Sequence, residues 1–122
     1  MYKLSELESW KSARQLRIAI SDLVKSFPAD EKFRLKDQII RSSRSIPANI
    51  AEGFGRFHYQ ENIQFCRIAR GSLYETLEHI MCAKDEGFIN EEKFNNINEQ
   101  ILECLKILNG YVQYLKKAKK ST

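Results

Sequence analysis

The stretch from Arg41 to Arg56 constrains the fold most, because it follows a helical pattern although a proline stands in its middle. Pro47 removes one backbone hydrogen bond from a helix and crowds the carbonyl of Ser43, at a cost of roughly 3 kcal/mol. Small side chains let a second helix approach closely, and serine hydroxyls can bond a carbonyl that a proline leaves free. The sequence therefore predicts a kinked helix, edged by arginines and packed tightly against its neighbours through small residues: Ser42, Ser43, Ser45, Ala48, Ala51, Gly53 and Gly55.

The composition favours a single soluble helical domain. The chain has 122 residues, of which 43% are hydrophobic and 30% charged, and it contains only 2 prolines and 5 glycines. Such a chain can bury a core. The longest uncharged run, Ile107–Leu115, is too short to span a bilayer, and the N-terminus has no apolar run typical of a signal peptide. We therefore expect a cytoplasmic protein without a membrane partner.

Four helical segments are predicted, at about residues 6–26, 30 to 53 or 55, 60–86 and 90–115. Ser5 and Glu8 form a capping box before the first, Gly87 ends the third, and Asn90 caps the fourth. Short turns between segments that each carry one apolar stripe favour an all-α, antiparallel up-down-up-down bundle. The predicted organisation is a bundle over residues 1–115, followed by a basic tail over 116–122.

Apolar spacing also indicates contacts beyond a single bundle. The last segment carries a heptad seam at Phe94, Ile97, Ile101, Cys104, Leu108, Tyr111 and Leu115. A second strip of Leu102, Leu105 and Val112 lies beside it and suggests that subunits associate. Trp10 is predicted to anchor the core or an interface, with base stacking as the alternative. Gly71 is predicted to mark a close helix crossing, since glycine inside a helix is otherwise unfavourable.

Charge is distributed unevenly around a net value of +4. Residues 1–70 hold 13 Lys/Arg against 8 Asp/Glu, residues 71–115 hold 3 against 8, and residues 116–122 hold 4 lysines and no acid. Such a chain can attract a polyanion or pair with itself, although ordinary solvated helix faces or a favourable helix end explain the charges equally well. The predicted nucleic-acid-binding residues are Arg41, Arg44, Arg56, Arg67, Arg70, Lys116, Lys117, Lys119 and Lys120.

No catalytic residue, metal site or cofactor is predicted, and we do not expect an enzyme. Glu75 and His79 have a spacing that suits a metal, but no second such pair exists, so a surface ion pair is the simpler interpretation. Three cysteines without a Cys-x-x-Cys pattern (Cys66, Cys82 and Cys104) favour buried reduced thiols over disulfides or zinc. A metal-dependent or hydrolytic enzyme is the outlying alternative.

Several motifs together resemble the bacterial 23S rRNA intervening-sequence proteins. The most specific is Ser45-Ile-Pro-Ala-Asn-Ile-Ala-Glu-Gly53-x-Gly-Arg56. The others are Leu7-Glu-Ser-Trp10-Lys, Phe27-Pro28, Leu35-x-x-Gln38-x-x-Arg41 and Ala69-Arg-Gly-Ser-Leu-x-Glu75. The resemblance covers nearly the whole chain.

This resemblance implies a four-helix bundle assembled into a ring, most simply a homopentamer. The fold is shared with accessory proteins of diversity-generating retroelements, which are similar to basic barrels that bind nucleic acid and a reverse transcriptase. Within the motif, Asn49 and Glu52 are expected to fix the kinked helix or a subunit contact, as are Pro47 and Gly53. Two hypotheses follow: a homo-oligomer that binds nucleic acid, plausibly structured RNA, and a protein-interaction scaffold without direct nucleic-acid binding.

Overall fold

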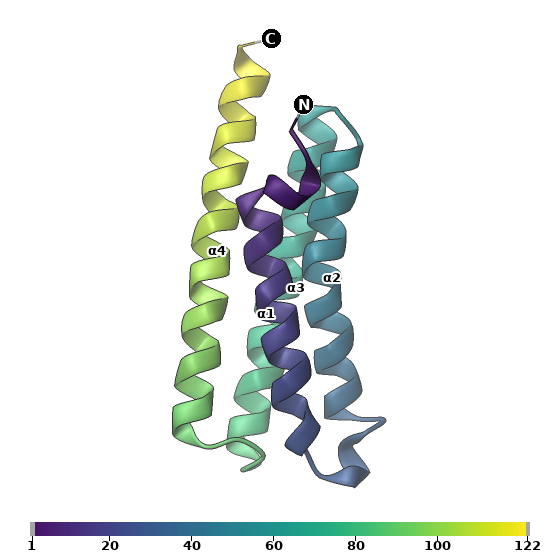
Figure 1. The fold of residues 1–122 in the computed structure, drawn as a ribbon, viewed down its shortest axis with the longest axis vertical. Coiled ribbons are helices and arrows are strands. Elements are labelled where there is room, and N and C mark those ends of the chain that lie inside the picture. Colours follow the sequence, from purple (N-terminus) through teal and green to yellow (C-terminus); the bar gives the residue numbers. More distant parts are fainter. Residues whose placement is uncertain (1, 122) are drawn as a thin grey trace.

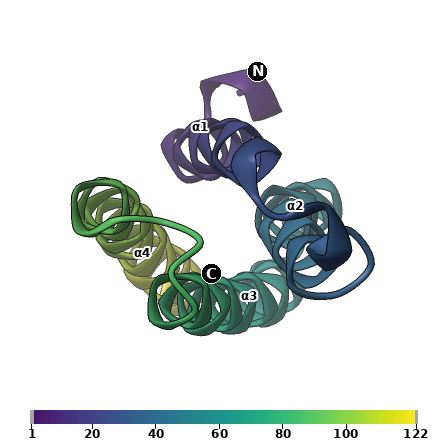
Figure 2. The ribbon, with the colours of Figure 1, turned by 90° about the horizontal axis from the view of Figure 1, so that it is seen from below.

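The computed structural model describes residues 2–121 as a bundle of four helices, with no strand among those residues. The helices are α1 (Glu8–Leu23), α2 (Leu35–Gly55), α3 (Tyr59–Asp85) and α4 (Glu91–Lys120). Consecutive helices run in opposite directions (Figure 1). Viewed end-on, they stand at four corners, and α4 returns to contact α1 (Figure 2). This arrangement confirms the predicted all-α four-helix bundle.

The core lies between the four apolar stripes, much as the spacing predicts. On α4 the predicted seam is buried except at Tyr111, which is only partly buried. Val112 is instead 3% exposed and belongs to the core, so its assignment to an outer strip is wrong. A straight α-helix drifts relative to a strict seven-residue repeat, which moves the core-facing position by one residue over so long a helix.

Two helix starts differ from their predictions. The capping box fails because Ser5 lies within the short 3-10 turn η1 (Leu4–Glu6), and the buried Leu7 occupies the cap position of α1 without a side-chain bond. The second helix begins at Leu35 rather than near Asp30, after the 3-10 turn η3 (Ala29–Glu31). Glu31 is buried and accepts a hydrogen bond from the Leu35 amide at 3.4 Å. A third 3-10 turn, η2 (Val24–Ser26), ends the first helical segment.

The turn between α3 and α4 follows the predicted chemistry. Gly87 adopts φ +78°, and the amides of Gly87 and Phe88 bond the carbonyls of Lys84 and Ala83, which closes the end of α3 in the Schellman pattern. Asn90 caps α4 by accepting a hydrogen bond from the Lys93 amide at 2.8 Å. Both predictions are confirmed.

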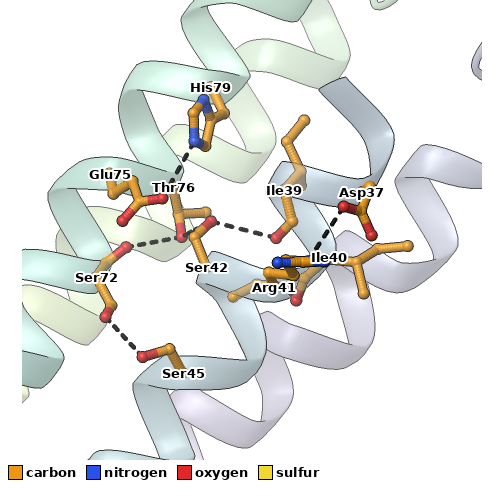
Figure 3. A network of polar contacts seen from close by, with 11 residues as sticks. Asp37, Ile39, Ile40, Arg41, Ser42, Ser45, Ser72, Glu75, Thr76 and His79 are labelled. Carbon is orange, nitrogen blue, oxygen red and sulfur yellow. Dashed lines mark hydrogen bonds and ion pairs between the residues drawn. The ribbon is translucent and has the colours of Figure 1, made fainter. Parts of the chain in front are cut away.

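The stretch with the proline forms one continuous helix against α3. Pro47 is buried inside α2. Small hydroxyl side chains join the two helices: Ser45 Oγ lies 2.8 Å from Ser72 Oγ, and Thr76 Oγ1 donates to Ser42 Oγ at 2.8 Å (Figure 3). The Ser42 and Ser43 hydroxyls donate to the carbonyls of Ile39 and Ile40, not to the Ser43 carbonyl that Pro47 leaves free. Ser42 and Ser45 therefore serve the contact between α2 and α3.

The four helices differ in length, and this difference shapes one end of the bundle. α4 has 30 residues and α1 only 16, so at 1.5 Å per residue α4 is about 20 Å longer. The C-terminal end of α4 extends past the start of α1, near the N-terminal segment and the turn between α2 and α3 (Figure 1). The four lysines of the predicted tail continue this helix to Lys120. Candidate binding surfaces lie around this end.

Candidate nucleic-acid interface

A basic groove lies between the start of α3 and the end of α4. It has a volume of about 490 Å³. Five cationic side chains line it together with Gln60, Ile63 and Gln113: Arg67, Lys116, Lys117, Lys119 and Lys120. We call these lining residues the basic groove. Lys119 donates a hydrogen bond to Gln60, which ties α4 to α3 here. A polyanion laid in this groove would relieve the mutual repulsion of the five cations.

The predicted arginines separate into two groups. Arg67 lines the basic groove, and Arg70, one turn along α3, donates to Asn109 Oδ1 of α4 at 3.1 Å. Both therefore lie on the α4 side of α3. Arg41 and Arg44 are exposed on α2, where Arg41 bonds Asp37 at 3.1 Å (Figure 3) and Arg44 has no ion-pair partner within residues 2–121.

Arg56 is held by contacts at the turn between α2 and α3. Its guanidinium pairs with Glu52 at 3.1 Å and Glu61 at 3.5 Å, and it lies over the ring of Phe65. The pair with Glu52 joins residues one turn apart at the end of α2, a spacing at which opposite charges on a helix meet. Two carboxylates leave little net charge here, so Arg56 is less available to a phosphate than Arg44 or Arg67.

An aromatic groove opens at the same end of the bundle. It has a volume of about 780 Å³. Six aromatic side chains from the N-terminal segment, the end of α2, the following turn, the start of α3 and α4 line it: Tyr2, Phe54, Phe57, Tyr59, Tyr111 and Tyr114. The rest of the lining is Leu7, Glu8, the buried Ser9, His58, Asn62, Ile107 and Leu115. We call this lining the aromatic groove. The groove forms because α1 begins only at Glu8. The C-terminal end of α4 extends past this start and has no part of α1 beside it (Figure 1).

Two ring pairs organise the aromatic groove. Tyr111 and Tyr114 stack with centroids 6.3 Å apart and planes 11° from parallel, and Tyr2 meets Phe54 edge-on at 6.1 Å. Asn62 Nδ2 donates to the Tyr111 hydroxyl at 2.9 Å, which leaves the phenolic proton of Tyr111 free to donate. Burial raises the pKa of Tyr111, so this hydroxyl stays protonated at neutral pH.

Gly53 sets the position of Asn62. A Cβ atom on Gly53 would lie 2.7 Å from Asn62 Oδ1 and 2.9 Å from Phe65 Cβ, so a glycine is needed for this contact between α2 and α3. Gly71 differs, because nothing lies within 4 Å of its hypothetical Cβ and it is exposed. The predicted close helix crossing at Gly71 therefore does not occur within residues 2–121 of the single chain, and a subunit contact there stays a prediction.

The other signature residues act mainly within the bundle. Asn49 donates to the carbonyl and hydroxyl oxygens of Ser45 at 2.8 and 2.9 Å, one turn back on α2. Trp10 is half-buried and packs against the core, and it does not itself line the aromatic groove as the structure describes it for residues 2–121. Sequence reasoning missed that groove, although the run Phe54 to Tyr59 holds three aromatic residues around a turn.

Titratable groups elsewhere show no arrangement typical of a metal site. His79 Nε2 lies 3.3 Å from Glu75 as a pair on α3 (Figure 3), and no cluster of three metal-ligating side chains occurs within residues 2–121. All three cysteines are free, with Cys66 and Cys104 buried and Cys82 only half-buried. Burial raises the pKa of Cys66 to about 11, which suits an inert core thiol.

No helix within residues 2–121 combines the length and the apolar character needed to cross a membrane.

Comparisons with known proteins agree with this fold. No curated protein matches the chain significantly. A crystal structure of a protein of unknown function from the S23 ribosomal protein family of Bacteroides thetaiotaomicron superposes with a TM-score of 0.79 at 26% identity, covering 85% of this chain and 97% of that one. The model of the family described as 23S rRNA-intervening sequence protein matches residues 5–110. The chain therefore belongs to the 23S rRNA-intervening sequence protein family.

Proposed function

We propose that this protein is a non-enzymatic homo-oligomer that binds nucleic acid, with structured RNA as the expected target. The observation that carries the proposal is the basic groove, where five cationic side chains from α3 and α4 meet. Clustered lysine and arginine side chains bind the phosphates of a nucleic acid, and these contacts do not depend on its base sequence. Binding is then mostly backbone-directed and sensitive to salt.

The end of α4 from Lys116 onward acts as the main basic segment beside a bundle formed by residues 1–115. Arg41 and Arg44 provide a second basic surface on the outside of α2, while Arg70 extends the basic groove toward Asn109. In an oligomer, each surface is repeated in every subunit. Repetition raises the overall affinity of weak sites without any strong single contact.

Fluorescence anisotropy with a labelled RNA hairpin, titrated at several salt concentrations, tests this function. The double variant Lys116→Ala/Lys120→Ala removes two cations from the basic groove. We expect it to bind more weakly and to lower the steepness of log K against log salt by roughly 1 to 2, because each phosphate contact contributes about 0.7 to 0.9.

The matched control is Lys25→Ala/Lys32→Ala, which removes the same charge at the opposite end of the bundle, where both lysines are exposed. We expect its salt slope to stay near that of the wild type. An equal loss of RNA affinity in both variants would mean that binding depends only on the net charge of the protein and not on the basic groove. Absence of binding by the wild type at low salt would reject nucleic-acid binding altogether.

A second candidate function is a protein-interaction scaffold, favoured by an apolar strip on the outside of α3 and α4. Leu73, Tyr74, Leu77, Ile101, Leu102 and Leu105 line a shallow apolar depression there. Leu102 is 51% and Tyr74 56% exposed, so the strip is open to a partner. We propose that it holds neighbouring subunits together in a ring, as the family resemblance implies, with an accessory protein as the alternative occupant.

A further inference from the structure

We propose that the aromatic groove receives an unpaired nucleobase while the basic groove holds the adjoining backbone, so that the preferred ligand is an unpaired segment of nucleic acid, such as the loop of a structured RNA. This inference rests on the proposed function and adds the class of ligand and the second half of the site. Its first support is the position of the two grooves at the same end of the bundle.

The two grooves meet along shared elements. Consecutive residues of α3, Tyr59 and Gln60, line the aromatic and the basic groove respectively. On α4, Leu115 lines the aromatic groove and Lys116 the basic one. A chain whose phosphates follow the lysines therefore passes the edge of the aromatic groove. Proteins that bind single strands combine a positively charged groove, which follows the phosphates, with aromatic side chains, on which the bases stack.

Phe57 gives the second support. This residue is 84% exposed at the turn between α2 and α3 and adopts φ +61°, a conformation that costs a bulky side chain energy and that glycine or asparagine adopts more easily. Neither exposure nor backbone favours phenylalanine here. Strained residues of this kind concentrate at functional sites. An exposed ring in the same groove as the stacked pair of Tyr111 and Tyr114 suits a base that stacks from outside.

Polar groups in the aromatic groove give the third support. Ser9 Oγ is buried and has no hydrogen-bond partner within residues 2–121, and Ser9 lines this groove. The Tyr111 hydroxyl accepts from Asn62 and keeps a proton to donate. A purely apolar occupant would leave these groups unsatisfied, whereas the edge of a nucleobase offers both donors and acceptors.

The test compares a fluorescein-labelled 12-nucleotide oligouridine with a 12-base-pair RNA duplex by anisotropy at one fixed salt concentration. We expect the single strand to bind at least about 10-fold more tightly than the duplex. Phe57→Ala and Tyr114→Ala should each weaken single-strand binding about 5- to 100-fold, because one lost base stack has roughly that effect. A parallel titration of these two variants at several salt concentrations should give the wild-type salt slope, since the lysines remain.

Phe33→Ala is the matched control, because Phe33 is also 84% exposed but lies before α2, outside the residues that line either groove. It should bind like the wild type. Circular dichroism verifies that each variant stays helical, and a strand with one 2-aminopurine should be quenched on binding to the wild type but not to Phe57→Ala.

Three outcomes overturn the proposal, and they are distinguishable. Equal binding of both probes, unaffected by Phe57→Ala and Tyr114→Ala, rejects the base site and leaves backbone binding by the basic groove intact. A change of oligomeric mass in Phe57→Ala, measured by sedimentation, assigns the aromatic groove to a second copy of the chain. Failure of both probes to bind at low salt rejects the proposed function together with this inference.

Discussion

Gly53 and Gly71 lie on neighbouring helices but have different surroundings. A Cβ atom at Gly53 would press into Asn62 and Phe65, whereas one at Gly71 would meet nothing within 4 Å. Gly53→Ala should therefore lower the free energy of unfolding by about 1–3 kcal/mol, as overpacking does. Gly71→Ala should raise it by about 0.5–1 kcal/mol, because alanine is the better helix former.

Urea unfolding followed by circular dichroism, at one fixed protein concentration, measures both changes. Opposite signs are the expected result. A gain in stability in both variants would mean that helix propensity alone governs both positions and that the contact between Gly53 and Asn62 carries no energy. Because Asn62 also donates to Tyr111 at 2.9 Å, Gly53→Ala should disturb the aromatic groove as well.

At the scale of elements, the contact between α2 and α3 depends on hydroxyl groups inside an otherwise apolar core. Thr76 is fully buried, and its Oγ1 donates to Ser42 Oγ and lies 2.8 Å from the Ser72 carbonyl (Figure 3). Thr76→Val keeps the shape but leaves Ser42 without this donor, at an expected cost of about 1–3 kcal/mol. Ser42→Ala alone should also destabilise the bundle.

The double variant Thr76→Val/Ser42→Ala distinguishes coupling from two separate losses. We expect it to be more stable than the sum of the single changes implies, by about 0.5 kcal/mol or more, because both members of the buried pair are gone. Ser26→Ala, at an exposed serine, is the control and should change little. Strict additivity would show that the two hydroxyls do not stabilise each other.

The sequence predicts these elements well and the surfaces between them poorly. Periodicity locates the four helices, and Gly87 and Asn90 mark real ends, because those signals are local. The capping box at Ser5 fails since tertiary burial of Leu7 outweighs it. The aromatic groove escapes prediction because its side chains come from segments far apart in the chain, and only the unequal lengths of α1 and α4 bring them to one opening.

The arginines lie on more than one surface for a related reason, because the direction in which a helical residue points changes by about 100° at each step. Arg67 and Arg70 therefore face α4, while Arg41 and Arg44 lie on α2. The lysines beyond Leu115, by contrast, meet Arg67 because α4 continues as a helix to Lys120.

At the scale of the whole molecule, the outer surface between α3 and α4 changes from apolar to basic along its length. Leu77 and Leu102 lie in the apolar depression, Arg70 and Asn109 follow, and Arg67 lies in the basic groove beyond them. An assembly that covers the apolar part can leave the basic part exposed. This division lets one surface serve both self-association and a polyanion.

Substituting Leu102 tests the assembly directly. Leu102→Glu places a charge in the centre of the apolar strip, where burial against another subunit would be costly. Sedimentation equilibrium should show the wild type as a multiple of the 14.3 kDa chain, five copies being the family expectation, and Leu102→Glu as a monomer. Since Leu102 is 51% exposed within one chain, the variant should remain folded.

Ile18→Glu is the control, since Ile18 is 45% exposed on α1, away from the strip. Loss of assembly in this variant alone would move the interface to α1. The wild type should also stay assembled in high salt, because apolar contacts do not weaken there, whereas an interface between the basic and acidic parts of the chain would dissociate. A wild type that sediments as a monomer would remove self-association from the proposal.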